Sequence, residues 1–339
     1  MPRIGTNPSR GKKLDFSPPR VTVAVLVYEP HGAGYFQHRR AVTLLTLQSI
    51  IANTQRPYEL LVFDNGSCPE MVSALQDMQA AGQIDTLILS RQNIGKLNAL
   101  WRIAQVAQGE LIAYSDDDVY HMDGWLEEHL KLLDNFPNVG AVTGFYIKQR
   151  VGMSSEKTLE WVKGYEQANP SLVERGNLIP PKWEEEYKVN SGREDARYQN
   201  EIAGLEDILV TYEGVKAFVS AHHFEVLLPK KVMTEILSEM LVNGWSDQLM
   251  GRMVEFDDRM DAKGYLRLTT YPQTMRLLGN VIDAEVAALA KADGIETTSI
   301  SNNNQSRGLI ARLAQHPKAR NLLQGIINRL YGLLHQEER

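Results

Sequence analysis

The sequence is short of cysteine, of positive charge and of long apolar runs, and each shortage argues against a class of protein. Its single cysteine, Cys68, cannot form an internal disulfide, which favours a reducing compartment over secretion. The formal net charge of -6 gives no overall attraction to nucleic acid, so we expect no nucleic-acid partner. No stretch approaches the roughly 18 to 20 apolar residues of a membrane span, and residues 1–20 lack the apolar run of a signal peptide. We therefore expect a cytoplasmic protein whose membrane contact, if any, is peripheral on the inner face.

The patterning of the chain predicts an α/β protein with an extension at each end. Apolar residues make up 43% of the sequence, which is enough for a buried core. Residues 1–20 are rich in Pro, Gly, Lys and Arg and are expected to form a flexible tail. Residues 21–150 alternate short apolar runs with amphipathic segments, which is typical of a mixed, mainly parallel sheet flanked by helices. Residues 151–285 begin polar and then become apolar, and residues 286–339 are expected to form a helical extension.

Polar side chains follow each of the predicted strands at 21–27, 59–63, 86–89 and 111–114. In open α/β sheets, ligands bind in the crevice at the carboxyl ends of the strands. We therefore expect one cleft to collect these side chains: Tyr28, Glu29, Asp64, Asn65, Asn93, Lys96 and Asp116–Asp118.

The run Asp116–Asp118 is the most informative of these groups. Three adjacent carboxylates at a strand end repel one another unless a cation or several hydrogen bonds offset their charge. Mg²⁺ and Mn²⁺ prefer carboxylate oxygens and keep coordination positions open for phosphate, so the run predicts a metal that binds a diphosphate. The alternative is that the aspartates cap a following helix.

Asp64 and Lys96 each have two interpretations. A carboxylate at the end of the second strand can accept hydrogen bonds from a nucleotide base or ribose, or Asp64 can belong to an Asp-Asn-Gly-Ser turn. Lys96 at a helix start can meet a phosphate or remain a solvated charge, and Gly95 beside it allows a close backbone approach.

A helix start is predicted directly after the Asp64 turn. Ser67-Cys68-Pro69-Glu70 has the pattern of a capping box with proline at the first helical position. The apolar face of this helix continues through Met71, Leu75 and Met78.

Taken together, these motifs resemble the family 2 glycosyltransferases with the GT-A fold, a Rossmann-like α/β fold. Each match is weak alone, but their order and spacing cover about the first 145 residues. The matching stretches are residues 46–50, 58–67, 93–96, 109–119 and 124–126.

The resemblance implies a nucleoside-diphosphate sugar donor, such as a UDP-, GDP- or dTDP-sugar, and inverting transfer to an acceptor hydroxyl. It implies a DxD motif in which Asp118 is the principal contact to Mn²⁺ or Mg²⁺ and Asp116 completes the motif. The metal would act as a Lewis acid on the departing diphosphate. Residues 21–150 would then bind the donor and residues 151–285 the acceptor. The donor-binding residues implied are Tyr28, Glu29, Asp64, Asn93, Lys96, Asp116 and Asp117, with Tyr28 and Asp64 near the base and Asp117 near the ribose.

The second half departs from the family pattern at the general base. Relatives carry a Glu-Asp pair roughly eleven residues before a Gly-aromatic pair, which here is Gly264-Tyr265. Counting back arrives at Arg252-Met253, so the base is expected among the nearby acids. The candidates are Glu255, Asp257 and Asp258, of which Asp257 is preferred.

A second departure concerns the metal. Many relatives place a metal-binding histidine just before a Gly-Asn pair, and here Leu277 and Leu278 precede Gly279-Asn280. Either Asp118 and the diphosphate hold the ion alone, or His222 or His223 contributes. A loop or acceptor-site role for the two histidines is the alternative.

The C-terminal segment and the acceptor remain open at the level of sequence. Leu322, Ile326, Leu330 and Leu333 recur at helical spacing, which predicts packing on the catalytic domain, a homodimer contact or peripheral membrane docking. The acceptor is expected to be a glycan, a lipid-linked molecule or a small molecule.

Two other functions fit the same residues. A sugar nucleotidyltransferase would share the metal and nucleotide chemistry, and His31-Gly32-Ala33-Gly34 with Arg39-Arg40 weakly resembles its phosphate loop. A catalytically silent relative that binds sugar or a partner would explain the missing Glu-Asp pair and the missing histidine.

Overall fold

The computed structural model describes residues 5, 7–148, 151, 153–190 and 204–300, and the chain divides into two compact units at Ser299/Ile300. The predicted apolar face at Leu322–Leu333, with its packing, dimer and membrane alternatives, lies outside the described residues. The following description concerns the first unit.

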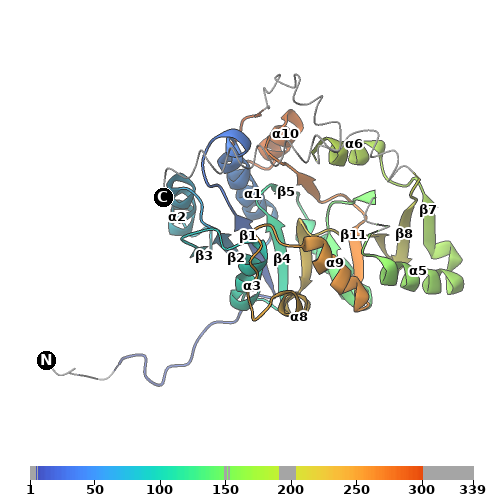
Figure 1. The fold of residues 1–339 in the computed structure, drawn as a ribbon, viewed down its shortest axis with the longest axis horizontal. Coiled ribbons are helices and arrows are strands. Elements are labelled where there is room, and N and C mark those ends of the chain that lie inside the picture. Colours follow the sequence, from blue (N-terminus) through green and yellow to red (C-terminus); the bar gives the residue numbers. More distant parts are fainter. Residues whose placement is uncertain (1–4, 6, 149–150, 152, 191–203, 301–339) are drawn as a thin grey trace. The chain divides into compact units, whose positions relative to one another are not determined.

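One sheet runs through the first unit, and its first four strands are parallel (Figure 1). In the described residues it has ten strands in the order β3-β2-β1-β4-β10-β6-β11-β9-β8-β7. The parallel strands are β1 (Val21–Val27), β2 (Glu59–Asp64), β3 (Thr86–Leu89) and β4 (Leu111–Asp116).

The second half of the chain extends the same sheet. β10 runs antiparallel to β4, and β6 and β11 pair in parallel. The added strands are β6 (Val139–Thr143), β7 (Val173–Gly176), β8 (Asp207–Tyr212), β9 (Val215–Val219), β10 (Glu225–Pro229) and β11 (Leu266–Thr270).

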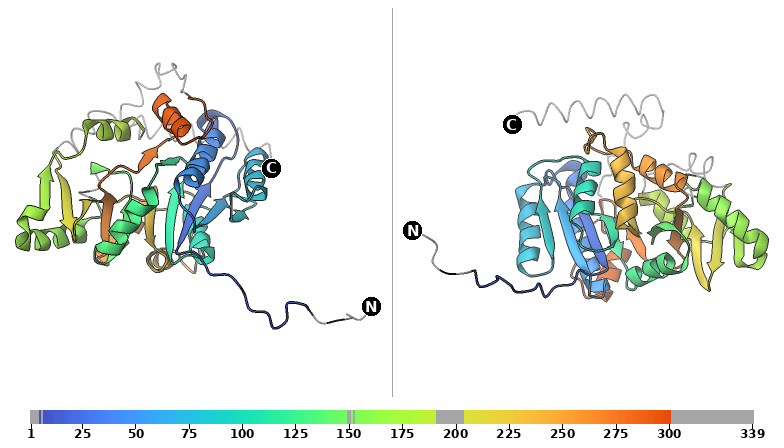
Figure 2. Two further views of the ribbon diagram at one scale, coloured as in Figure 1. Left: turned by 180° about the vertical axis from the view of Figure 1, so that it is seen from behind. Right: turned by 90° about the horizontal axis from the view of Figure 1, so that it is seen from below.

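Buried side chains alternate along β1 and so feed two separate cores. Val21, Val23, Val25 and Val27 enter one core, while Ala24 and Leu26 enter the other. Because successive strand residues point to opposite faces, an apolar strand of this kind needs helices on both sides. Figure 2 shows helices on both sides of the sheet.

Each core has its own helices. The core containing Ala24 and Leu26 is covered by α3 (Lys96–Val106), α8 (Lys230–Met240) and α9 (Met253–Ala262). The other is covered mainly by α1 (Arg39–Asn53), α2 (Pro69–Ala80) and α4 (Trp125–Asn135), and α5 (Glu156–Ala168) adds Val162. The remaining elements are η1 (Gly34–Phe36), η3 (Pro170–Leu172), α6 (Pro181–Asn190) and α10 (Ala284–Ala292).

A two-stranded sheet closes the carboxyl end of β4. β5 (Val119–His121) pairs antiparallel with β12 (Met275–Leu277), and Leu277 lies opposite Val119. The Leu278 amide then donates to the Asp118 carbonyl at 2.8 Å. The acid run is thereby joined to residues 278–280.

The structure confirms the predicted α/β class, a sheet flanked by helices. It corrects the start of α2, because the N-cap is Cys68 and no side chain caps the helix. The Ser67 hydroxyl instead accepts a hydrogen bond from the Glu29 amide at 2.9 Å. The prediction of a capping box was therefore wrong, while Pro69 lies in the first turn of α2 as predicted.

Candidate active site

The three aspartates lie at the end of β4, in the turn that leads to β5. Asp116 is the last residue of β4, and a strand rather than a helix begins at Val119. The alternative in which Asp116–Asp118 cap a helix is therefore wrong. The acids instead lie where the end of β4 meets the end of β1 and the start of α1.

Asp117 is buried and held from three sides. Its carboxylate accepts hydrogen bonds from Arg39 at 3.1 Å, from the Thr43 hydroxyl at 3.1 Å and from the Tyr28 amide at 3.4 Å. The Thr46 hydroxyl donates to the Asp117 carbonyl at 3.2 Å. These bonds fix the turn relative to β1 and α1.

Arg39 is the main counter-charge of the acid run. The nitrogen that meets Asp117 also donates to Asp118 at 3.0 Å, and its second terminal nitrogen donates to the Asn280 side chain at 2.9 Å. Burial disfavours its charge, but the two carboxylates outweigh burial and raise the pKa of Arg39. The sequence connects Arg39 and Arg40 only to the nucleotidyltransferase alternative, so it does not predict the contact of Arg39 with the aspartates. Arg40 lies 3.7 Å from the Glu29 carboxylate.

Asp116 is paired separately with Lys96. The ammonium group donates to both carboxylate oxygens, at 2.7 and 2.9 Å, and the Tyr114 hydroxyl also donates to Asp116. Lys96 is the first residue of α3, as predicted. It is an ion-pair partner in the fold and not a solvated charge, because its side chain is only 18% exposed.

Asp118 has one carboxylate oxygen that no described residue uses. Burial and the Asp117 charge raise the pKa of Asp118 to about 7, although Arg39 opposes the shift. Its Oδ2 meets Arg39, and no described residue donates to its Oδ1. A cation at Oδ1 would offset the charge that the fold leaves uncompensated.

Asp64 forms the turn that was one of its two interpretations. Its carboxylate accepts from the Gly66 and Ser67 amides, each at 3.2 Å, and burial raises its pKa. A carboxylate offers about four acceptor positions, so the turn leaves capacity for a ligand.

Asn65 and Asn93 join the ends of β2 and β3. The side-chain nitrogen of Asn65 donates to the side-chain oxygen of Asn93 at 3.1 Å. The side-chain oxygen of Asn65 accepts from the backbone amide of Ile94 at 2.9 Å. Gly95 follows with φ of +84°, and a Cβ placed there would lie 2.5 Å from the Gln248 carbonyl oxygen. The close approach predicted at Gly95 is thus made by the chain itself.

Glu29 is buried and only partly compensated. Its side chain is 1% exposed, burial raises its pKa, and no described group donates to Oε2. Its backbone ties the end of β1 to the start of α2, because the Glu29 carbonyl accepts from the Cys68 amide at 2.7 Å.

The three candidate bases on α9 have different surroundings. Asp257 is 2% exposed and meets Arg267 at 2.9 Å and His223 at 2.8 Å. Glu255 pairs with Arg252 at 2.9 Å and Arg259 at 2.7 Å. Asp258 is exposed and accepts from the Ser154 hydroxyl at 2.5 Å.

The neighbouring histidines also differ. Nε2 of His222 lies 3.0 Å from the Phe145 carbonyl, and its Nδ1 accepts from the Phe224 amide at 3.2 Å. Both ring nitrogens are thus engaged, so His222 has none left for a metal. His223 uses Nδ1 for Asp257.

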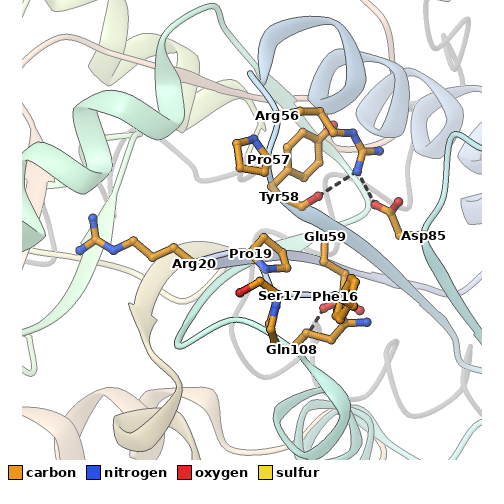
Figure 3. A pocket seen from close by; sticks show the side chains of 11 residues that line it. Phe16, Ser17, Pro19, Arg20, Arg56, Pro57, Tyr58, Glu59, Asp85 and Gln108 are labelled. Atoms are coloured by element: carbon orange, nitrogen blue, oxygen red, sulfur yellow. Dashed lines mark hydrogen bonds and ion pairs between the residues drawn. The ribbon is translucent and has the colours of Figure 1, made fainter. Parts of the chain in front are cut away.

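A separate cavity of about 670 Å³ lies at the opposite edge of the sheet, near the amino ends of β1 and β2 (Figure 3). In its lining, Arg56 donates a hydrogen bond to the Asp85 carboxylate at 2.7 Å and another to the Tyr58 carbonyl at 2.8 Å. Among the described residues its lining includes none of the predicted site residues.

Residues 37–188 match the family model described as Glycosyl transferase family 2. This segment belongs to glycosyl transferase family 2. It contains Arg39, Asp64, Lys96 and Asp116–Asp118, whereas His223 and Asp257 lie beyond it.

One curated relative is the Glucosyl-dolichyl phosphate glucuronosyltransferase of Haloferax volcanii. It is 26% identical over 127 residues, which are 36% of this chain and 40% of that protein. The chain thus matches less than half the length of this relative.

Two solved structures show a looser likeness. S. aureus TarS 1-349 is 10% identical, with a TM-score of 0.43 over 76% of this chain and 60% of that one. The mannosyltransferase PcManGT from Pyrobaculum calidifontis, in complex with GDP-Man and Mn²⁺, is 24% identical, with a TM-score of 0.33 over 43% and 44% of the two chains.

The three aspartates fit a divalent ion only in part. Within the described ranges no group of three His, Cys, Asp or Glu side chains is arranged to hold a metal. Asp116 is paired with Lys96, and Arg39 is paired with both Asp117 and Asp118. Oδ1 of Asp118 is the oxygen of this run that would be open to an ion. Such a site is complete only when a ligand supplies further oxygens. No described helix is long and apolar enough to cross a membrane.

Proposed function

We propose that this chain is a glycosyltransferase that binds a nucleoside-diphosphate sugar and moves its sugar to an acceptor hydroxyl with inversion. The observation that carries the proposal is the arrangement of Asp116–Asp118 with Arg39 and Lys96 at the carboxyl end of β4, inside the family 2 segment. Ligands of open α/β sheets bind at this edge.

The donor would lie across the ends of β1, β2 and β4. Tyr28 and Asp64 would contact the nucleotide base. The carboxylate of Asp64 has acceptor positions left for the N–H groups of the base. Asp117 would lie near the ribose. Glu29 and Asn93, at the ends of β1 and β3, would line the same pocket.

Lys96 and Arg39 would offset the negative charge of the diphosphate. Lys96 Nζ meets both oxygens of Asp116, and an ammonium group with three donors would still have capacity for a phosphate oxygen. The buried Arg39 keeps its charge beside Asp117 and Asp118. A fixed positive group close to a leaving diphosphate stabilises charge as it develops.

Asp118 Oδ1 would hold Mn²⁺ or Mg²⁺ together with oxygens of the bound diphosphate. The ion would supply Lewis-acid neutralisation of the leaving group. Asp116, the other predicted metal ligand, would act indirectly, because its two oxygens already meet Lys96.

Residues 151–285 would bind the acceptor and supply the base. The curated relative acts, by its name, on a glucosyl-dolichyl phosphate, so we include a lipid-linked sugar among the acceptors to be tested. We propose cytoplasmic action with a glycan, lipid-linked or small-molecule acceptor.

The test is a binding and turnover panel of UDP-, GDP- and dTDP-sugars with and without MnCl₂. We expect one donor class to raise the melting temperature by mass action and to release nucleoside diphosphate slowly. Asp118→Asn should lose the Mn²⁺-dependent part of the shift, while Asp123→Asn, an exposed control, should keep it. Release of pyrophosphate would favour a nucleotidyltransferase, and binding without turnover a silent relative.

A further inference from the structure

We propose that His223 is the catalytic base that takes the acceptor's proton, with Asp257 and Arg267 as the residues that position its ring. The inference rests on the proposed glycosyltransferase function and assigns the base to a side chain outside the family 2 segment.

Asp257 is held too firmly to reach an acceptor itself. Its Oδ1 meets Arg267 at 2.9 Å and its Oδ2 meets His223 Nδ1 at 2.8 Å. Arg267 is fully buried and also donates to the Ala221 carbonyl at 2.7 Å and to the Ser154 carbonyl. Both oxygens of Asp257 are therefore engaged by groups that the fold immobilises.

The residue that follows His223 is bonded to the acid run. His223 directly precedes Phe224, whose carbonyl accepts the Asp116 amide at 2.7 Å. The next residue, Glu225, is paired in register with Ser115 of β4. The loop between β9 and β10 thus brings His223 to the same sheet edge as the proposed donor site.

The contact with Asp257 decides which ring nitrogen can act. Oδ1 of Asp257 is paired with Arg267, and its Oδ2 faces Nδ1 of His223. When Nδ1 donates its proton to this carboxylate, Nε2 of the ring is left as an acceptor. No described residue forms a hydrogen bond with His223 Nε2, and the side chain keeps 11% of its surface exposed. Its neighbour His222 lacks this capacity because both of its nitrogens are engaged.

The chemical step balances with this assignment. As the acceptor oxygen forms its bond to the anomeric carbon, the bond from that carbon to the diphosphate oxygen breaks and the electron pair leaves with the diphosphate. The acceptor proton passes to Nε2 of His223. The resulting imidazolium is stabilised by the Asp257 carboxylate.

The alternatives on α9 are less suited to this role. Glu255 is paired with two arginines, and Asp258 is bonded to Ser154 at the surface. Within the described part of the chain, neither is joined to the end of β4 by a hydrogen bond like that between Phe224 and Asp116.

The experiment measures hydrolysis of whichever of UDP-glucose, UDP-glucuronate or GDP-mannose the wild type binds, with water as the nucleophile. For His223→Gln we expect the kcat of hydrolysis to fall about 100-fold or more, because a general base contributes about 10² to 10⁴. KM and the donor dissociation constant should change by less than about threefold, because the substitution leaves the contacts that bind the donor in its ground state unchanged. The matched control is His38→Gln. The His38 side chain makes no capping hydrogen bond to α1, so this variant should hydrolyse the donor at the wild-type rate.

A second variant separates chemistry from folding. His223→Ala should regain part of its rate when imidazole is added, which a merely structural histidine would not show. Hydrolysis by His223→Gln at the wild-type rate, or a loss in His223→Ala that imidazole does not restore, would overturn the assignment. A wild type that binds no member of the UDP-, GDP- and dTDP-sugar panel would overturn the proposed function, and this inference with it.

Discussion

One terminal nitrogen of Arg39 donates to both Asp117 and Asp118, at 3.1 and 3.0 Å. Arg39 is separated from the two aspartates by β2, α2, β3, α3 and β4 in the sequence, yet the three residues form the electrostatic centre of the proposed donor site. Because the Arg39 side chain is 6% exposed, its charge is compensated by these two acids and not by water. The pair therefore links the stability of the fold to the charge state of the site.

Arg39→Met should destabilise the protein strongly. Removing one partner leaves buried carboxylates uncompensated, and such changes cost about 3 to 5 kcal/mol. The measurement is the free energy of unfolding by urea at pH 7.5 without divalent ions. Arg102→Met on the exposed side of α3 is the control and should stay within about 0.5 kcal/mol of wild type. Equal stability of Arg39→Met and wild type would contradict the pairing.

Asp118→Asn should become stabilising as the pH rises. The folded pKa of Asp118 is raised to about 7, so the fold favours its protonated form, and that contribution is lost as the pH rises through 7. Asparagine resembles the protonated acid and does not lose it. We expect no difference from wild type near pH 4 and a gain of at least about 1 kcal/mol at pH 8.

The check is urea unfolding of both proteins at several pH values with a chelator present. Asp123→Asn, which is exposed, should follow the wild type throughout. A difference between Asp118→Asn and wild type that does not grow with pH would show that Asp118 is ionised without cost.

Gly95→Ala should cost more than Gly82→Ala. Both glycines have positive φ, +84° and +72°, so alanine is strained at each. At Gly95 the new Cβ would also lie 2.5 Å from the Gln248 carbonyl oxygen, whereas nothing lies within 4 Å at Gly82. We expect about 1 kcal/mol at Gly82 and about 1 to 3 kcal/mol more at Gly95.

Thermal unfolding of the two variants measures this difference. The Gly95 substitution should also weaken donor binding, because Lys96 follows it and its amide donates to the Leu249 carbonyl at 2.8 Å. Similar melting temperatures for the two variants would mean that residues 248–249 yield freely.

Local sequence was sufficient for the four parallel strands, for the helix starts at Pro69 and Lys96, and for the collection of polar groups at one sheet edge. Strands such as Val21–Val27 are apolar on both faces, which only a sheet covered on both sides satisfies. The positions of Asp64, Lys96 and Asp116–Asp118 followed from the strand ends. Their proposed roles remain predictions.

Several features depended on contacts between distant segments. Arg39 was noticed only as half of an Arg-Arg pair, since nothing local connects α1 to the β4–β5 turn or to Asn280. The sequence around Ser67 has the pattern of a helix cap, but the Ser67 hydroxyl accepts a hydrogen bond from the Glu29 amide at the end of β1.

The amino-acid order by itself determined the α/β class and the edge where the acids gather, because apolar periodicity and strand-end position are local properties. Only the tertiary structure decided which charges meet: Arg39 with Asp117 and Asp118, and Arg267 and His223 with Asp257. The physical reason is that a buried charge must find its partner in space, and the sheet brings together residues that the sequence keeps far apart.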